Sequence, residues 1–305
     1  MADFSANTRP FAELDRAGRT RRLRRLAETA LTAYAVPVAR LTPLGRGANT
    51  TFRVDGADGH RYVLRVQRPD GPDVSRVRSE MRWLAALGRD TDLVVPRPVP
   101  TRERDLVTVV ADPAVPEPRT CVLCHWVEGR FVDERLRAPQ LYAVGAFTAR
   151  LQLHGSRMSG LDRGRVDDLT DFGRAQVDGF SDAVVERAVA AADGDPRVRA
   201  ALERVRAVRA ELGCGPDVFG LVHGDLHQEN YLFHRGGVRA TGFDACGFGH
   251  HAYDLAVTLD ALGPRPALRE ALLDGYRSVR PGTATTDPTV LAAFIGLRRV
   301  QRRLY

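Results

Sequence analysis

The chain has 305 residues, of which 44% are hydrophobic and 27% charged, enough to build one large domain or two smaller cores. No apolar stretch approaches the roughly 20 residues that cross a bilayer, and residues 1–20 lack the apolar segment of a signal peptide. Four cysteines are too few for a disulfide framework in a chain of this length. We therefore expect a cytoplasmic protein with no membrane partner.

The basic residues need separate attention because all 45 are arginine and the sequence contains no lysine. A net charge of +7 can indicate nucleic-acid binding. Here the arginine bias, together with abundant Ala, Gly, Val and Asp, is more typical of GC-rich coding sequence. The densest basic run, 19–25, lies in a segment with helical apolar spacing, which predicts an amphipathic helix with a solvated arginine face. We expect no nucleic-acid partner.

The first part of the chain predicts mainly strands after this helix. Apolar residues alternate around glycine-rich turns, a pattern typical of β-hairpins. The expected strands cover 36–44, 50–54, 61–66, 106–110 and 120–125, with an amphipathic helix at 74–88. These elements predict a small, mostly antiparallel sheet with one main helix, forming an N-terminal lobe over residues 1–125.

The rest of the chain, 126–305, is predicted to form a larger, mostly helical lobe. The expected helices cover 136–154, a pair within 174–212 and 289–305, and short strands are expected at 218–222, 231–234 and 238–243. A strand-rich first part joined to a helix-rich second part predicts an α+β fold in two lobes. The boundary between such lobes is a natural ligand site.

The most informative motif is His-Gly-Asp-Leu-His-Gln-Glu-Asn at 223–230, directly after the apolar segment 218–222. It places Asp225 and Asn230 five positions apart, the HxDxxxxN spacing of the kinase catalytic loop. Phosphoryl transfer needs a carboxylate to orient the attacking hydroxyl and accept its proton, and an amide oxygen to hold magnesium on the nucleotide phosphates. The alternative is a polar loop in which both residues serve the turn.

Two upstream features are candidates for contact with nucleotide phosphates. The Gly45-Arg46-Gly47 turn could lay backbone N–H groups over phosphates, although a G-x-G in a hairpin is often only a turn. Arg65 could pair with phosphates while Glu80 fixes it from the next helix. Kinases normally use lysine here, and arginine offers a planar fork instead. The alternative is a surface Arg–Glu pair of little energetic value.

In this order and spacing the motifs resemble the aminoglycoside phosphotransferase family, which includes choline kinases and type II homoserine kinases. The resemblance covers nearly the whole chain from about Leu41 to the last helix. It rests on the segments 45–49, 62–65, 78–80, 126–129, 223–225, 230 and 253–256. It implies a two-lobed, protein-kinase-like fold with ATP between the lobes, Mg²⁺ as cofactor and a hydroxylated small molecule as acceptor.

The resemblance also implies roles for individual residues. Asp225 would be the catalytic base and Asn230 a magnesium ligand, and Asp254 would brace the catalytic loop without touching substrate. Arg65 would hold the phosphates with Glu80 behind it, as the residues themselves suggest. The backbone around Trp126 and Val127 would meet the adenine.

The sequence departs from the family at the main magnesium ligand. The family carries an aspartate on the strand after the asparagine, and Gly242 stands at that position. Asp244 could act from a shifted register on the same face of a strand, although two strand residues span roughly 7 Å, more than an aspartate reaches. Alternatively, Asn230 and the phosphates hold the metal with reduced turnover, or the protein binds nucleotide or metabolite without transferring phosphate.

The acceptor itself is weakly indicated. An aminoglycoside needs carboxylates to receive its amines, and the helical part offers several, although a solvated acidic face explains them more simply. Homoserine, choline, a sugar or a protein serine are alternatives. The aspartates concerned are Asp162, Asp167, Asp168, Asp171, Asp178 and Asp182.

Overall fold

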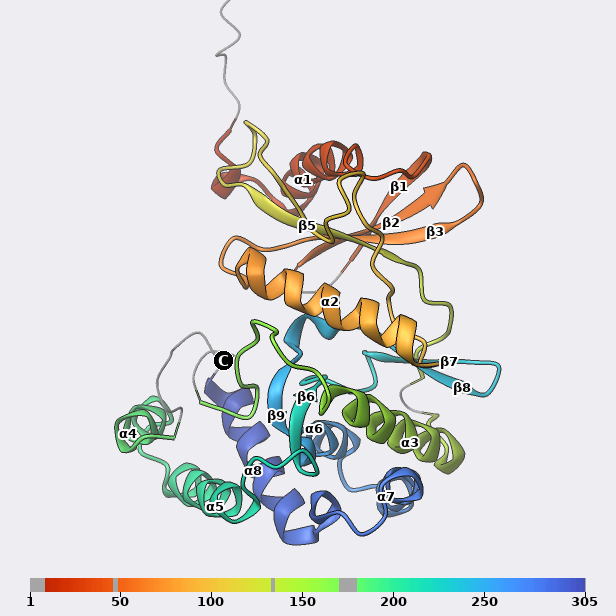
Figure 1. The fold of residues 1–305 in the computed structure, drawn as a ribbon. Coiled ribbons are helices and arrows are strands. Elements are labelled where there is room, and N and C mark those ends of the chain that lie inside the picture. Colours follow the sequence, from red (N-terminus) through yellow and green to blue (C-terminus); the bar gives the residue numbers. More distant parts are fainter. Residues whose placement is uncertain (1–8, 46–48, 133–134, 170–179, 305) are drawn as a thin grey trace, which may run out of the picture. The chain divides into compact units, whose positions relative to one another are not determined.

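The computed structural model describes residues 9–45, 49–132, 135–169 and 180–304 (Figure 1). They fall into two compact units, one built from the described parts of 1–86 and 96–126 and the other from those of 87–95 and 127–304. The first unit contains a five-stranded antiparallel sheet and the second is mainly helical, so the predicted α+β class is confirmed. None of the described helices has the length and apolar character needed to cross a membrane.

The first unit is a sheet with strand order β1-β2-β3-β5-β4, in which every neighbouring pair is antiparallel. Each expected strand is present, the fourth being shorter than predicted. The elements are η1 (Phe11–Glu13), α1 (Arg16–Leu31), β1 (Val38–Leu44), β2 (Thr50–Gly56), β3 (Arg61–Val66), α2 (Val74–Asp90, whose last turn belongs to the second unit), β4 (Thr108–Val110) and β5 (Arg119–His125).

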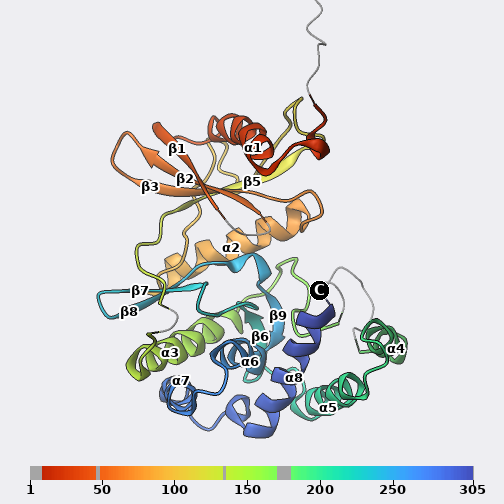
Figure 2. The same cartoon turned by 180° about the vertical axis from the view of Figure 1, so that it is seen from behind.

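Helix α1 lies along the sheet and closes its core (Figure 2). Its apolar residues Leu26, Ala27 and Ala30 are wholly buried against inward-facing strand residues such as Phe52 and Leu64. Most of the arginines within 19–25 are exposed, so the amphipathic helix is confirmed. Alternation along β2 and β3 therefore sends one set of side chains into this core and the other set away from it.

The second unit combines helices with two separate two-stranded sheets, β6–β9 and β7–β8. Its elements are α3 (Ala138–Gly155), α4 (Asp182–Ala191), α5 (Pro196–Leu212), β6 (Phe219–Val222), β7 (Tyr231–His234), β8 (Gly237–Ala240), η3 (Phe243–Ala245), β9 (Gly247–His250), α6 (His251–Leu262), α7 (Pro266–Val279), η4 (Ala284–Thr286) and α8 (Pro288–Leu304).

The strand predicted at 238–243 is wrong beyond Ala240. Gly242 has φ +75°, a left-handed conformation that stops the strand and starts the short helix η3. The chain then returns as β9 to pair with β6, a strand that the sequence did not predict.

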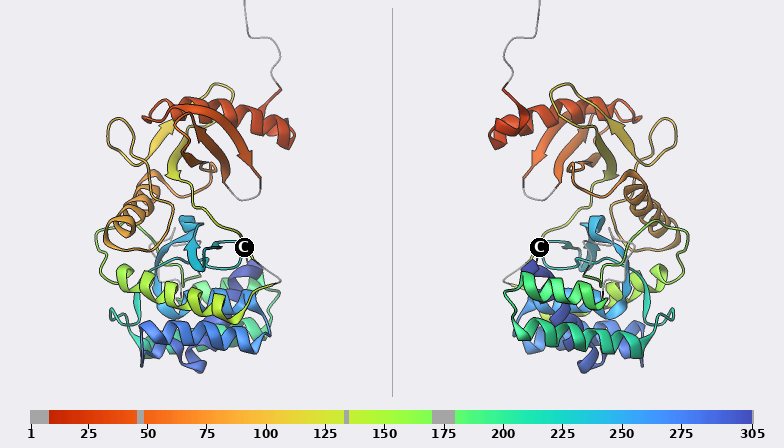
Figure 3. Two further views of the ribbon diagram at one scale, coloured as in Figure 1. Left: turned by 90° about the vertical axis from the view of Figure 1, so that its right-hand side faces the viewer. Right: turned by 90° about the vertical axis from the view of Figure 1, so that its left-hand side faces the viewer.

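Helices α3 and α7 pack so closely that their backbones meet (Figure 3). A Cβ atom on Gly145 would lie 1.9 Å from the carbonyl oxygen of Leu272, and one on Gly275 would lie 1.9 Å from that of Tyr142. Both glycines are therefore required by the contact between the two helices.

Candidate active site

The loop 223–230 joins β6 to β7, and Asp254 of α6 fixes its first residues. The Asp254 carboxylate accepts hydrogen bonds from the backbone N–H of His223 at 3.0 Å and of Gly224 at 2.7 Å. It is wholly buried, and that burial raises its pKa. The predicted brace is confirmed. Gly224 has φ +81°, and a Cβ there would lie 2.5 Å from the carbonyl oxygen of Ala245, so this position requires glycine.

Asp225 follows this bend with its carboxylate held by three side chains. Oδ1 accepts from Arg298 Nη2 at 2.6 Å, and Oδ2 lies 3.2 Å from His227 Nε2 and 3.1 Å from Asn230 Nδ2. Burial raises the pKa of Asp225, but the hydrogen bond and charge of His227 and the charge of Arg298 outweigh it and leave the pKa lowered. Asp225 is therefore an oriented carboxylate that is ionised at neutral pH.

His227 is oriented from both sides of its ring. Its Nδ1 accepts from the backbone N–H of Glu229 at 3.3 Å, which assigns the proton to Nε2 and makes Nε2 the donor to Asp225. His227 is therefore held within the loop by hydrogen bonds, and its ring also lines a cavity.

Asn230 faces Gly242 across the loop. Its Nδ2 donates to the Asp225 carbonyl oxygen at 2.7 Å, and a Cβ built on Gly242 would lie 2.4 Å from Asn230 Oδ1. A side chain at position 242 would thus point at the amide oxygen proposed to bind metal. Gly242 stands where a carboxylate could join Asn230, and it supplies none.

Asp244 does not lie on the same face of a strand as Gly242, which was the reason to expect that it replaces the missing aspartate. It lies in η3 rather than on a strand with Gly242, and residues two apart in a 3₁₀ turn point in different directions. Its backbone carbonyl accepts from Arg163 Nη2 at 2.9 Å. The metal role of Asp244 stays a prediction without the strand geometry that suggested it.

Magnesium prefers an octahedral set of oxygen ligands that includes carboxylates. Within the described residues, no group of three or more His, Cys, Asp or Glu side chains could hold a metal ion. Asn230 offers one amide oxygen, and the nearest carboxylate, Asp225, is occupied by Arg298, His227 and Asn230 itself. The residues present therefore do not form a protein-built magnesium site.

In the first unit, Arg65 of β3 and Glu80 of α2 form a two-pronged ion pair. Arg65 Nη1 donates to Glu80 Oε1 at 2.8 Å and Nη2 to Oε2 at 2.6 Å. The side chains are 14% and 1% exposed, so the alternative of a surface pair is wrong. Bidentate geometry is what distinguishes arginine from lysine at this position.

Gln67, which is 3% exposed, extends this pair. With its amide oriented so that both polar ends are satisfied, its oxygen accepts from Arg65 Nε and Nη2, each at 3.2 Å. Its nitrogen then donates to Asn49 Oδ1 at 2.6 Å, and Asn49 Oδ1 also accepts from the Arg68 N–H at 3.1 Å. Sequence analysis missed Gln67, which is two residues from Arg65 along the strand.

Of the remaining predicted nucleotide contacts, the structure gives positions for Gly45, Trp126 and Val127 but no nucleotide-binding geometry. Gly45 follows the end of β1, and Gly47 lies outside the described residues. The Trp126 N–H donates to the Arg61 carbonyl oxygen at 2.9 Å, and the Arg61 guanidinium lies 5.9 Å from the centre of the Trp126 ring. Val127 is half-buried. Adenine contact at 126–127 stays a prediction.

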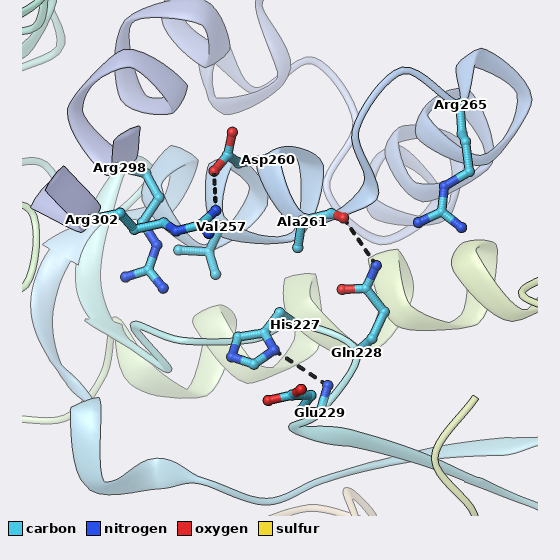
Figure 4. A pocket seen from close by; sticks show the side chains of 9 residues that line it. All are labelled: His227, Gln228, Glu229, Val257, Asp260, Ala261, Arg265, Arg298 and Arg302. Carbon is cyan, nitrogen blue, oxygen red and sulfur yellow. Dashed lines mark hydrogen bonds and ion pairs between the residues drawn. The ribbon is translucent and has the colours of Figure 1, made fainter. Parts of the chain in front are cut away.

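A cavity of about 560 Å³ opens beside the catalytic loop (Figure 4). Two of the three side chains that hold Asp225, namely His227 and Arg298, are part of its wall. The described residues that line it are His227, Gln228, Glu229, Val257, Asp260, Ala261, Arg265, Arg298 and Arg302. The sequence analysis did not single out these arginines; Arg298 and Arg302 are one turn apart on the last helix, a spacing that places them on one face.

Among the aspartates considered for an aminoglycoside, those that the structure describes do not line this cavity. Asp167 and Asp168 are 0% and 7% exposed, and Asp167 contacts His250 and Arg165, so a solvated face is the wrong account for them. Asp182 does pair on the surface, with Arg206 at 2.6 Å. Asp171 and Asp178 lie outside the described residues.

The five-stranded sheet, the buried Arg–Glu pair and the braced HGD loop define a protein of the kinase-like fold that small-molecule kinases share. The chain belongs to the phosphotransferase enzyme family, whose model matches residues 40–292. The predicted family and fold are thereby confirmed.

Solved structures agree with this assignment. A microcompartment-associated aminopropanol kinase is 30% identical, with 92% of this chain and 88% of that chain covered and a TM-score of 0.70. The amicoumacin kinase hAmiN, in complex with AMP-PNP, Ca²⁺ and Ami, is 18% identical, with 94% and 87% covered and a TM-score of 0.72. The spectinomycin phosphotransferase APH(9)-Ia, with ADP and spectinomycin, is 14% identical, with 91% and 85% covered and a TM-score of 0.60. No match to a curated protein was found.

Proposed function

We propose that this protein transfers a phosphoryl group from ATP to a hydroxyl of a small molecule. The observation that carries the proposal is Asp225, an ionised carboxylate oriented by Arg298, His227 and Asn230 beside a cavity of substrate size. Family membership and the 30% identity to an aminopropanol kinase support a small-molecule alcohol as the acceptor class.

Asp225 would orient the acceptor hydroxyl and take its proton as the oxygen attacks the terminal phosphorus. A carboxylate oxygen has two acceptor sites, so Oδ1 can receive the hydroxyl while it keeps the hydrogen bond from Arg298. ATP supplies the phosphoryl group, and ADP leaves as the P–O bond breaks. Arg65, held in a fixed orientation by Glu80, would neutralise phosphate charge. Catalysis then consists of positioning and charge stabilisation.

The second candidate is a protein that binds nucleotide or metabolite with little or no phosphoryl transfer. Gly242 favours it, because the position facing Asn230 lacks the carboxylate that would complete a metal pair. Electrostatic groups of this kind are worth on the order of 3 kcal/mol of transition-state stabilisation each. We therefore assign no step to a bound metal.

ADP release in the presence of hydroxylated small molecules tests the first candidate. We expect acceptor-dependent turnover in the parent protein and a loss of about 10²–10⁴-fold in Asp225→Asn, because the general base is removed. Asp274→Asn is the matched control, since Asp274 is 55% exposed and pairs with the surface residue Arg277. Turnover that survives Asp225→Asn would reject the proposed base. ATP binding without turnover for any acceptor would support the second candidate.

A further inference from the structure

The charges that line the cavity identify the acceptor more closely. We infer that the acceptor carries an anionic group, a carboxylate or a phosphate, that the cavity arginines bind while its hydroxyl reaches Asp225. The inference rests on the proposed function, because it treats this cavity as the acceptor site of that reaction. Three of the nine lining residues are arginines, namely Arg265, Arg298 and Arg302.

Asp260, one of the two acids of the cavity wall, is already neutralised. Its Oδ1 accepts from Arg299 Nε at 2.7 Å and its Oδ2 from Arg302 Nη1 at 3.2 Å. The carboxylate is 7% exposed and has a cation on each oxygen. Because Asp260 is buried and both of its oxygens already accept from arginines, it would attract a substrate ammonium group only weakly.

Glu229, the other acid, is an exposed residue of the catalytic loop. A carboxylate surrounded by water attracts a cation weakly, because the high dielectric constant of water screens the interaction. Glu229 therefore offers an amine little binding energy. Arg298 pairs with Asp225 and Arg302 with Asp260, so neither acid of the cavity wall neutralises Arg265.

Arg265 is the cation most available to a ligand. Its Nε donates to the Leu262 carbonyl oxygen at 2.7 Å, which fixes the side chain at the end of α6. Among the described residues, no carboxylate lies within ion-pairing distance of its guanidinium. Figure 4 shows this guanidinium at one end of the group of lining side chains and Arg298 with Arg302 at the other.

Arg298 adds a constraint close to the reacting hydroxyl. Its Nη2 lies 2.6 Å from Asp225 Oδ1, so any substituent next to the hydroxyl meets a guanidinium. An ammonium group there would be repelled, whereas a carboxylate or phosphate oxygen would be attracted. The planar guanidinium fork matches the oxygens of both anions, so the cavity selects the charge shared by the two.

A matched set of alcohols tests this inference by binding alone, without ATP. The neutral probe is propane-1,3-diol. In 3-hydroxypropanoate a carboxylate replaces one of its hydroxymethyl groups, and in 3-aminopropan-1-ol an ammonium group replaces one of its hydroxyls. Glycerol 3-phosphate and glycerol form a second pair, with and without a phosphate. At roughly 10 mM ligand and constant ionic strength, we expect at least one anionic probe to raise the Tm of the protein. The neutral and ammonium probes should leave it unchanged. The two anionic arms distinguish carboxylate from phosphate.

Arginine variants then locate the bound anion. Arg265→Gln and Arg302→Gln should each weaken binding of the anionic probe about tenfold, the usual loss when a charged hydrogen bond is removed. Arg269→Gln is the control for Arg265, because Arg269 also donates to an α6 carbonyl, that of Leu259 at 2.7 Å, but does not line the cavity. Arg303→Gln is the control for Arg302, since Arg303 lies on the same helix as Arg302 but pairs with Asp195 and does not line the cavity.

The outcomes separate this inference from the proposed function. Binding of an anionic probe that is lost in the two cavity variants supports the inference even if no ATP is consumed. Tighter binding of 3-aminopropan-1-ol than of the anions would overturn it. Equal effects of the cavity and control variants would overturn it too, as would the absence of any shift with both anionic probes.

Discussion

Arg298 on the last helix donates to the Asp225 carboxylate at 2.6 Å, across 73 positions of the chain. The two side chains are 16% and 29% exposed, so their charges are only partly screened. The pair places a permanent cation on the residue proposed to accept a proton. Arg298 therefore affects both the ionisation of Asp225 and the charge of the cavity that Arg298 lines.

Replacing Arg298 with methionine should raise the pKa of Asp225. Burial already acts to raise it, and Arg298 is one of the charges that keep it lowered. Asp225 must be ionised to accept a proton, so activity of the parent should fall only at a pH below the usual aspartate pKa of about 3.9. In Arg298→Met the acid limb of kcat/KM should move to higher pH. In Arg298→Lys, which keeps the positive charge, most of this shift should be absent.

The same variant should lose stability in a pH-dependent way. A lowered pKa in the folded state stabilises the fold above the unfolded pKa of about 3.9, and this stabilisation disappears as pH falls through the folded value. Arg298→Met should therefore lose about 1–2 kcal/mol of unfolding free energy at neutral pH and less at acid pH. Urea unfolding at several pH values measures this difference. An unchanged loss at every pH would show that Arg298 acts through packing alone.

Asp254→Asn should distort the catalytic loop without touching substrate. The carboxylate accepts from the backbone N–H groups of His223 and Gly224, and an amide at this position can accept through only one oxygen. We expect a loss of about 2–3 kcal/mol of unfolding free energy, because a buried N–H is left without its acceptor. Hydrogen exchange should become faster at 223–224. Unchanged exchange there would contradict the bracing role.

The catalytic loop could be predicted from the sequence because its function fixes local spacing. Asp225, Asn230 and their preceding strand all lie within a few residues of one another, and the structure brings these two side chains to 3.1 Å. Arg65 and Glu80 were similarly predictable, since a strand followed by a helix presents them to each other. In each case the partners come from neighbouring elements.

The contacts that were missed depend on long-range packing. Arg298 reaches Asp225 only because α8 packs against α6, and no local pattern of the sequence encodes that packing. The strand predicted through 243 had suitable apolar alternation, but the left-handed Gly242 ended it. Asp167 and Asp168 were read as a surface because their charge suggested water, whereas His250 and arginines bury Asp167. At these positions, contacts with residues distant in the sequence determined the structure, and local composition did not predict them.

Glu80→Gln should weaken ATP binding through Arg65. The variant leaves a guanidinium that is 14% exposed without its bidentate acceptor, which should cost about 3 kcal/mol of unfolding free energy. The KM for ATP should rise, because the arginine is no longer held in one orientation. Asp105→Asn is the control, because Asp105 pairs at 2.9 Å with Arg78, which lies on the same helix as Glu80. Both side chains of that pair are about a third exposed or more, so its loss should matter less.

Gln67→Met tests whether the arginine needs a second support. Methionine fills similar space but cannot accept from Arg65 Nε, so the guanidinium keeps Glu80 and loses the Gln67 contact. We expect a several-fold rise in the KM for ATP with a smaller change in kcat, the pattern for lost ground-state binding. Combining Gln67→Met with Arg65→Lys should add little further loss, because lysine has no Nε donor to lose. Additive losses would show that Gln67 acts independently of Arg65.

The Gly242→Asp variant decides whether the missing carboxylate limits the reaction. A Cβ at this position would lie 2.4 Å from Asn230 Oδ1, so the Asn230 side chain must shift, and φ +75° strains any residue other than glycine. Gly242→Ala imposes the same strain and crowding without a carboxylate and is the matched control. Magnesium titrations of ATP turnover compare the two.

If the carboxylate is what the site lacks, Gly242→Asp should exceed Gly242→Ala in turnover by at least tenfold at equal magnesium, because a carboxylate next to Asn230 would strengthen metal binding. If the parent is already a competent enzyme, both variants should be slower than it by similar factors, since each displaces Asn230. The second result would mean that the nucleotide phosphates carry the metal and that glycine is required by the packing of Asn230 against the loop.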